Sequence, residues 1–222
     1  MTGASVALFA KTPRAGRVKT RLVPPLTHED AARVAHASIV DTMRRIVPSV
    51  SARWTLFLEG ERDEAIEALA KEHGVATASQ RGEDLGERLW SAFQELRLRS
   101  DGAVLAIGSD SPTLDPQRIE EAIEALQVCD VVLGPTEDGG YYLIGMSGDH
   151  GALFRDIPWS SGGTAAVTLE RARERSLEVR LLAPWYDLDD PESLARARGE
   201  ITSEWALHEV LEGIGGKLGG FA

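Results

Sequence analysis

The chain has 222 residues, of which 43% are hydrophobic, so it can form the core of one large domain or two small ones. Its formal net charge of −11 makes it a poor candidate for binding the backbone of DNA or RNA. A single cysteine, Cys129, excludes an intrachain disulfide, and no apolar run approaches the ~20 residues of a membrane-spanning helix. We therefore expect a cytoplasmic protein whose partners include neither nucleic acid nor a membrane.

Basic side chains are concentrated near the start of the chain. Residues 1–28 contain five basic residues and no acidic one, so the remainder carries a net charge of −16. These five are Lys11, Arg14, Arg17, Lys19 and Arg21. Such a segment in an acidic protein suggests a small anionic ligand, such as a phosphate ester. The alternative is a solvated turn that balances nearby acids, and charge alone does not decide between them.

The first half of the chain alternates predicted strands and helices. Four short apolar runs predict buried strands, at residues 5–10, 54–58, 75–79 and 103–107. Thr27 followed by Asp30 resembles a capping box, and the amphipathic helix that it starts extends to about Val47. Two further amphipathic segments predict helices, at residues 62–73 and 85–98.

The second half continues the alternation. Asp115 is expected to cap a helix that has Pro116 at its first position, and Ser203 to cap a last helix that ends near Glu212. Three strands are predicted, at residues 128–133, 141–146 and 178–182. Two more helices are predicted, at residues 162–175 and 191–198.

This alternation predicts an α/β, Rossmann-like fold: one domain over residues 1–212, with a mostly parallel mixed sheet flanked by helices. The Gly-rich tail, residues 213–222, is expected to be flexible. Ligands bind beyond the carboxyl ends of the strands in such sheets. We therefore expect the loops at 11–21 and 108–113 at the binding edge, with the loop near 136–140 close to it.

No complete standard nucleotide-binding motif is present. Residues 16–20 resemble the end of a P-loop, but Val18 precedes the lysine where a P-loop has glycine. No G-x-G-x-x-G follows the first predicted strand, which argues against dinucleotide binding of that type. The five histidines lack the spacing of a zinc site.

Three other segments are candidates for chemistry. The basic loop 11–21 contains a glycine and can surround a triphosphate with backbone N–H groups and cations. In the second segment, Asp110 follows a buried strand and can reach a hard cation such as Mg²⁺; an Asx turn is the structural alternative. In the third, Asp187 and Asp189 alternate along an extended chain and face one side, so either can complete a magnesium site with Asp110.

These segments, together with a fourth, resemble a known family. The matching stretches are Phe9–Leu22, Gly108–Leu114, Gly134–Gly145 and Asp187–Leu194, in this order. They resemble the GT-A-like family "transferase 1, rSAM/selenodomain-associated", which is similar to 2-phospholactate guanylyltransferase and, more distantly, to other nucleotidylyltransferases. The resemblance covers roughly residues 4–198 and implies the nucleotide-diphospho-sugar transferase fold.

The resemblance also implies roles for individual residues. It implies nucleotide binding by Phe9, Ala10, Lys11, Arg14, Gly16, Lys19, Arg21, Gln80, Gly82, Leu85, Gly86 and Ser109. Lys19 and Arg21 would contact the triphosphate and, with Asp110, count as catalytic, while the segment around Gln80 would read the nucleobase. Mg²⁺, or Mn²⁺, would be held by Asp110 and completed by Asp189 or Asp187. The second substrate would be bound by Glu137, Asp138, Gly139, Gly140, Trp159 and Ser160.

Three functions are compatible with these residues. In a nucleotidylyltransferase, a phosphate of a small acceptor would attack the α-phosphorus of a nucleoside triphosphate and release pyrophosphate. In a glycosyltransferase, the same residues would hold a nucleotide sugar; a non-catalytic nucleotide-binding module is the third possibility. The dense cationic loop favours a triphosphate and therefore the first. We expect a monomer or homodimer.

Overall fold

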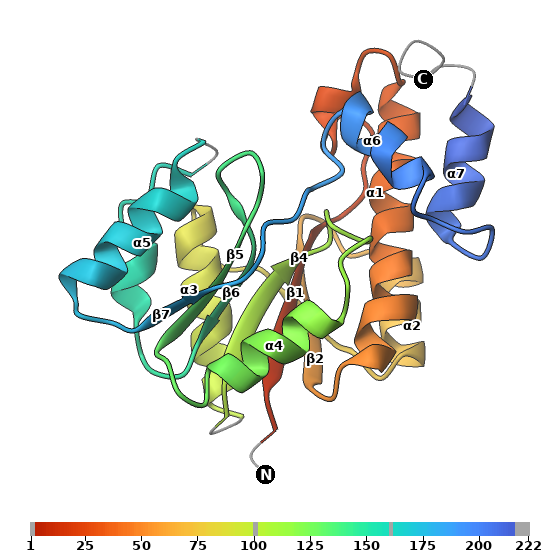
Figure 1. The fold of residues 1–222 in the computed structure, drawn as a ribbon. Helices are drawn as coiled ribbons and strands as arrows, with labels where there is room; N and C mark the ends of the chain where they lie inside the picture. Colours follow the sequence, from red (N-terminus) through yellow and green to blue (C-terminus); the bar gives the residue numbers. More distant parts are fainter. Residues whose placement is uncertain (1–2, 100–101, 160–161, 216–222) are drawn as a thin grey trace.

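The computed structural model describes residues 3–99, 102–159 and 162–215. In it, one sheet lies between two layers of helices (Figure 1). In the described residues the strands are β1 (Ser5–Lys11), β2 (Arg53–Glu59), β3 (Ala76–Ser79), β4 (Val104–Gly108), β5 (Val131–Pro135), β6 (Tyr141–Met146) and β7 (Val179–Leu181). They lie in the order β3-β2-β1-β4-β6-β5-β7, with β6 antiparallel to both of its neighbours and the other pairs parallel. The predicted α/β fold with a mostly parallel mixed sheet is confirmed.

Helices cover both faces of this sheet. They are α1 (His28–Asp41), α2 (Glu64–Glu72), α3 (Leu85–Arg97), α4 (Gln117–Ala125), α5 (Thr164–Glu174), α6 (Pro191–Arg198) and α7 (Ala206–Ile214). Helices α2 and α4 and the π-helical turn after α1 pack on one face, and α3 and α5 pack on the other. Both faces are buried because crossover helices connect most of the parallel strands.

Strand β1 shows how the sequence divides the two cores. Its residues Val6, Leu8 and Ala10 face the core under α2 and α4, whereas Ala7 and Phe9 face the core under α3. Successive side chains of a strand point to opposite faces, so a continuous apolar run is what a strand buried on both sides requires. Because β1 lies inside the sheet, between β2 and β4, the loop that follows its carboxyl end lies near the middle of that edge of the sheet.

A third apolar cluster joins α6 and α7 to α1, through Ala31, Val34 and Ala37. Here the prediction that Ser203 caps the last helix is wrong, because α7 begins only at Ala206. The Asp41 carboxylate accepts hydrogen bonds from the backbone N–H groups of Ala206 and Leu207, each at 2.8 Å. A carboxylate from a distant helix thus satisfies the N–H groups that a local cap would otherwise bind.

Other element boundaries also differ from the predictions. The first helix does not continue regularly to Val47; it changes to a π-helical turn at Thr42–Ile46 and a 3-10 turn at Val47–Ser49, where Pro48 lacks an N–H. The strand predicted from residue 128 begins at Val131, because the N–H groups of Val128 and Cys129 still bond to Ala125 at the end of α4.

The end of the chain differs as well. Helix α7 continues past the predicted domain boundary at residue 212 to Ile214. The rest of the predicted flexible tail, residues 216–222, lies outside the described residues.

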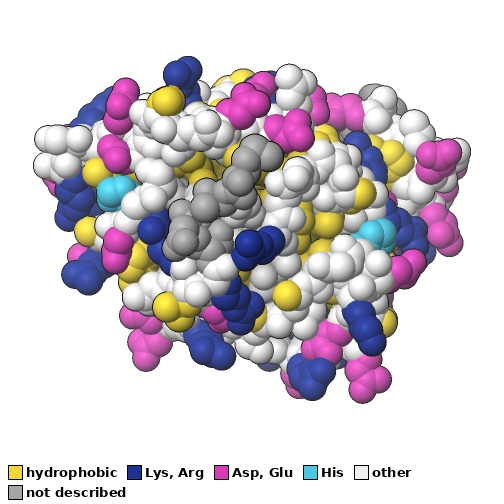
Figure 2. Space-filling model, turned by 90° about the horizontal axis from the view of Figure 1, so that it is seen from below, with side chains coloured by type: hydrophobic (Ala, Val, Ile, Leu, Met, Phe, Trp, Pro, Cys, Tyr) yellow, Lys and Arg dark blue, Asp and Glu magenta, His cyan; other side chains and the backbone are white. Residues whose placement is uncertain are grey.

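The face at the amino ends of the parallel strands is mixed in charge. Figure 2 shows basic and acidic side chains distributed around this face, with hydrophobic side chains between them. No helix in the described part of the chain is long and apolar enough to cross a membrane.

Candidate functional site

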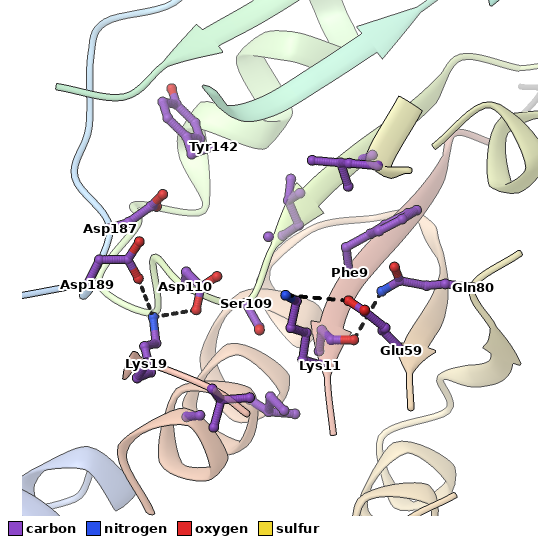
Figure 3. Close-up of a pocket in the computed structure, with 18 of the residues that line it drawn as sticks. Phe9, Lys11, Lys19, Glu59, Gln80, Ser109, Asp110, Tyr142, Asp187 and Asp189 are labelled. Carbon is purple, nitrogen blue, oxygen red and sulfur yellow. Dashed lines mark hydrogen bonds and ion pairs between the residues drawn. The ribbon is translucent and has the colours of Figure 1, made fainter. Parts of the chain in front are cut away.

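A cavity of about 430 Å³ opens at the carboxyl ends of β1 and β4. Both predicted loops contribute to it, the first through Lys11 and residues 17–21 and the second through residues 108–110. Figure 3 shows two ends: a charged end at Lys19 and the aspartates, and a second end at Gln80 and Phe9. The buried residue Ser109, whose N–H donates to the carbonyl of Phe9 at 3.0 Å, lies between them.

At the charged end, the ammonium of Lys19 lies between two carboxylates. Its Nζ is 3.0 Å from Asp189 Oδ1 and forms a second ion pair with Asp110 (Figure 3). The Lys19 side chain is only 3% exposed, whereas those of Asp110 and Asp189 are 52% and 38% exposed. Burial alone lowers the pKa of Lys19, but the two carboxylates outweigh burial and the pKa is raised, so Lys19 is a permanent cation here.

Local structure explains why Lys19 points inward. The residue has a left-handed backbone conformation, with φ of 49°, directly before the 3-10 turn η1 (Thr20–Leu22). Val18 and Leu22 on either side of it are buried. The two apolar anchors fix the backbone at this point and leave the lysine side chain directed at the aspartates.

The third aspartate, Asp187, is held beside this pair. The Ser111 hydroxyl donates a hydrogen bond to its carboxylate, and the N–H of Leu188 donates to the carbonyl of Asp110 at 2.8 Å. These bonds attach the segment 187–189 to the loop after β4. Burial, and then the charge of Asp110, raises the pKa of Asp187 to about 7.

The donor set fits a magnesium ion that also binds a ligand. In the described residues, no group of three or more His, Cys, Asp or Glu side chains is arranged to hold a metal ion. Asp110 and Asp189 nevertheless converge on one cation position, that of the Lys19 ammonium. Mg²⁺ is commonly bound by one or two carboxylates together with phosphate oxygens and water, rather than by an all-protein cage.

The opposite end of the cavity is mostly apolar. The Gln80 side-chain amide donates to the carbonyls of Ala10 and Phe57, at 3.0 Å each. Both of its hydrogens are therefore engaged, and its carbonyl oxygen is the atom that remains for a ligand. Phe9 stacks on Phe57 with ring centroids 5.6 Å apart, and Leu85 at the start of α3 lines the cavity and is 41% exposed.

Gly82, in the turn after Gln80, and Gly86, in α3, do not line the cavity but shape the chain next to it. Gly82 has φ of +139°, and a Cβ there would lie 2.6 Å from Glu87 Cβ and 2.8 Å from the Arg88 nitrogen. A Cβ on Gly86 would collide with the Phe154 carbonyl and the Trp159 ring. Only glycine fits these two positions.

The remaining basic residues of loop 11–21 divide into two groups. Lys11 lines the cavity and pairs with Glu59 at 3.6 Å, whereas Arg14 lies outside the cavity lining, 3.9 Å from Asp63. Gly16, with φ of +78°, forms the turn that follows and does not line the cavity either. Arg17 and Arg21 line the cavity, and the ion pairs that this loop makes with described residues are those of Lys11, Arg14 and Lys19.

The residues expected to bind the second substrate are less well gathered. Among the described residues that line the cavity, none comes from 137–140. Glu137 pairs with Arg196 at 3.0 Å, and the Asp138 carboxylate accepts from the Thr136 hydroxyl at 2.6 Å and from the N–H of Gly140.

Gly139 and Trp159 lie near the cavity without lining it. Gly139 has φ of +88°, and its carbonyl accepts from the N–H of Ala165 at 3.0 Å. The Trp159 ring packs edge-on against Tyr141, which lines the cavity, with centroids 6.3 Å apart. Ser160 lies outside the described residues.

Sequence reasoning missed several residues of the cavity wall. Arg17, in the predicted loop, and Tyr141 and Tyr142, in the matching stretch Gly134–Gly145, were not named as site residues, and Glu59 was not expected at all. Glu59 had a detectable signal, because it ends β2 and pairs in parallel register with Lys11 at the end of β1. The two tyrosines begin β6 directly after the loop 136–140, which was expected near the binding edge, so their position in the chain was the signal that could have found them.

Comparison with known proteins identifies the class of protein. A family model described as "Uncharacterized protein conserved in bacteria (DUF2064)" matches residues 42–161, and the chain belongs to this family. A solved structure from Desulfovibrio desulfuricans G20, assigned as a nucleotide-diphospho-sugar transferase, superposes with a TM-score of 0.87 and 27% identity. That superposition covers 100% of this chain and 99% of the other.

Two curated relatives are guanylyltransferases. The 2-phospho-L-lactate guanylyltransferase of Methanopyrus kandleri is 35% identical over 48% of this chain, a match that spans only about half, 55%, of that protein. The phosphoenolpyruvate guanylyltransferase of Rubrobacter xylanophilus is 29% identical over 69% of this chain and 76% of that protein. The predicted family resemblance, the nucleotide-diphospho-sugar transferase fold and the enzyme class, a transferase, are confirmed.

Proposed function

We propose that the protein is a Mg²⁺-dependent nucleotidylyltransferase, which moves a nucleoside monophosphate from a nucleoside triphosphate to a small phosphorylated acceptor. The observation that supports this most directly is the charged end of the cavity. There the exposed carboxylates of Asp110 and Asp189 converge on one cation position, and Arg17 and Arg21 line the same cavity. Carboxylates for a metal and cations for phosphates are the two requirements of phosphoryl chemistry.

The nucleoside fits the end of the cavity at Gln80. In this proposal its base lies against Phe9 and Leu85, and the fixed carbonyl oxygen of Gln80 accepts a hydrogen bond from the base. Guanine offers N–H donors on its pairing edge, and both curated relatives are guanylyltransferases. We therefore propose GTP as the preferred nucleotide.

The phosphates then run past Ser109 toward Asp110. An oxygen of the acceptor's phosphate attacks the α-phosphorus, the bond from the α-phosphorus to the bridging oxygen breaks, and pyrophosphate leaves with the bonding electron pair. Arg17 and Arg21 bind the β- and γ-phosphates and stabilise the charge that develops on pyrophosphate. Asp110 and Asp189 would hold Mg²⁺, which would neutralise charge on the phosphate oxygens. The protein thereby aligns reactants without a covalent intermediate.

The acceptor class follows from the same relatives. They are named for 2-phospho-L-lactate and phosphoenolpyruvate, so we propose a small phosphorylated organic acid. Tyr141 and Tyr142, at the side of the cavity next to the loop 137–140, are candidates for its contacts.

A second candidate is transfer of a sugar from a nucleotide sugar. It is favoured by the similarity to the nucleotide-diphospho-sugar transferase of D. desulfuricans, which covers nearly the whole of both chains. The carboxylate pair would then hold the metal on a diphosphate.

Pyrophosphate release is the decisive measurement. The protein is incubated with Mg²⁺, each of the four nucleoside triphosphates and a panel that includes 2-phospholactate and phosphoenolpyruvate. Release with GTP and one of these acids supports the proposal. Turnover of nucleotide sugars alone supports the second candidate, and nucleotide binding without any turnover supports a non-catalytic module.

We further propose that the protein works in the cytoplasm as a monomer or homodimer. The single cysteine, Cys129, supports a reducing compartment. Cell fractionation and light scattering test the two statements.

A further inference from the structure

Lys19 differs from the other cations of its loop because it is already committed to the carboxylate pair. Arg17 and Arg21 line the cavity and are not among the loop residues that form ion pairs with the described part of the chain. Lys19, in contrast, is enclosed and contacts both Asp110 and Asp189. The carboxylates, in contrast, remain open to the cavity, with exposed fractions of 52% and 38%. The ammonium therefore occupies the place between the two carboxylates where a metal ion would bind.

A free divalent cation must compete with this ammonium. With Lys19 in place, two carboxylate charges are partly balanced by one positive charge that is shielded from water. A second cation would meet both a reduced negative charge and direct repulsion from the ammonium. Buried Val18 and Leu22 anchor the backbone on either side of Lys19. When the ammonium leaves the carboxylates, the backbone therefore stays in place and the long side chain moves into the cavity.

A nucleoside triphosphate offers the place for that swing. Its phosphates bring several negative charges into the cavity next to the lysine, and an ammonium on a flexible stem can exchange a carboxylate partner for a phosphate without backbone movement. Resting on the proposed nucleotide transfer, we propose that Lys19 is a resident cation that closes the Asp110–Asp189 pair to free divalent metal until the triphosphate draws its ammonium away.

The first test measures Mn²⁺ binding to the protein without nucleotide, by electron paramagnetic resonance of the unbound ion. Lys19→Met should lower the Kd for Mn²⁺ about tenfold or more, because the two carboxylates lose their internal counter-ion. Lys11→Met removes an equal charge from the same cavity, where Lys11 pairs with Glu59, and should leave the Kd near that of the wild type. Adding Asp189→Asn to Lys19→Met should reverse the gain.

Equal Mn²⁺ affinities for the wild type and Lys19→Met would overturn the inference. An equal increase in Mn²⁺ affinity for Lys11→Met would also overturn it, since the effect would then come from the net charge of the cavity and not from the contact of Lys19 with the carboxylates.

The second test uses the wild-type protein, so it does not depend on whether Lys19→Met folds. The chain has four lysines, Lys11, Lys19, Lys71 and Lys217, so ¹³Cε-lysine labelling gives a simple spectrum. The Lys19 signal should move when the α,β-methylene analogue of GTP, or inorganic tripolyphosphate, is added without metal. The signal of Lys71, on α2, should stay in place. An unmoved Lys19 signal at saturating analogue would overturn the inference.

These outcomes are separable from those of the proposed function. Pyrophosphate release with an unmoved Lys19 signal would preserve the transfer reaction and remove the role of Lys19. A shifted Lys19 signal, without pyrophosphate release from the triphosphate in the presence of any acceptor, would preserve the exchange and remove the transfer reaction.

Discussion

The two ends of the cavity are held in shape by different forces. At the charged end, side chains from three separate segments meet through ion pairs, such as that of Lys19 and Asp189, which lie 170 residues apart in sequence. At the other end, Gln80 is fixed by hydrogen bonds to backbone carbonyls and by the conformation of Gly82. Ion pairs can be exchanged for ligand charges, whereas the hydrogen bonds from the Gln80 amide to strand carbonyls involve no charge that a ligand could replace. The first end is therefore suited to chemistry and the second to recognition.

The largest effect is expected from Asp110. Asp110→Asn should reduce nucleotide transfer by about 10³-fold, because it removes a carboxylate from the proposed metal site and one partner of Lys19. Its side chain is half exposed, so the thermal unfolding midpoint should change little. Asp115→Asn, at the start of α4, is the matched control and should retain activity. Wild-type turnover of Asp110→Asn would remove the charged end from the reaction.

Arg17 and Arg21 should rank second. Replacing either with alanine should lower kcat/KM by about one to two orders of magnitude, since a charge-assisted contact contributes about 1.5–3 kcal/mol. If the contact forms mainly on the leaving pyrophosphate, kcat should fall more than nucleotide affinity. Arg173→Ala, on the exposed side of α5, provides the control. A loss of nucleotide affinity with kcat unchanged would assign the two residues to binding alone.

Gly82 tests the recognition end. Gly82→Ala should weaken nucleotide binding and cost about 1–3 kcal/mol of stability, because the new Cβ must displace Glu87 and the backbone of Arg88. Gly74→Ala is a matched control: its φ is +69°, but a Cβ there meets nothing within 4 Å. Both variants should therefore lose stability, and only Gly82→Ala should lose affinity in calorimetry. Equal affinities would mean that the Gln80 turn does not contact the nucleotide.

The smallest effect concerns the pH dependence of stability. The pKa of Asp187 is raised from its ordinary 3.8 to about 7, so its favourable contribution to folding is complete below pH 3.8 and is lost as the pH rises through about 7. Asp187→Asn should therefore increase the unfolding midpoint at pH 8 relative to the wild type and change it little at pH 4. Ser111→Ala removes a hydrogen bond that lowers this pKa, so the loss should occur at higher pH. Parallel midpoint curves for all three proteins would contradict the shift.

Much of the fold was predictable because its signals are local. The strand at 141–146 and the helix at 191–198 have the predicted bounds, and capping boxes form at both Thr27 and Asp190. Apolar periodicity and capping act over a few residues, so they are visible in one sequence. Ser203 failed as a cap because the carboxylate of Asp41 is a partner that no local pattern reveals.

The candidate site was predictable only in part. The convergence of loops 11–21 and 108–113 follows from the parallel sheet, since β1 and β4 are neighbours that end at one edge. The alternation of Asp187 and Asp189 suggested that either could join Asp110, and the family resemblance implied Asp189, with Asp187 as the alternative. That Glu137 pairs with Arg196, and that Arg14 faces away from the cavity, depended on side-chain directions that the sequence does not encode in any short pattern.

The sequence by itself determined the alternation of strands and helices, the edge of the sheet that carries the polar loops, and the presence of a basic loop in an acidic chain. Each of these depends on neighbours along the chain, through apolar spacing, caps and charge density. The tertiary structure alone decided that Lys19 lies between Asp110 and Asp189 while Arg17 and Arg21 line the cavity. In sequence these residues are equivalent basic positions of one loop. They differ because Val18 and Leu22 are buried, which turns one cation inward, and because the folded sheet brings two distant carboxylates to meet it.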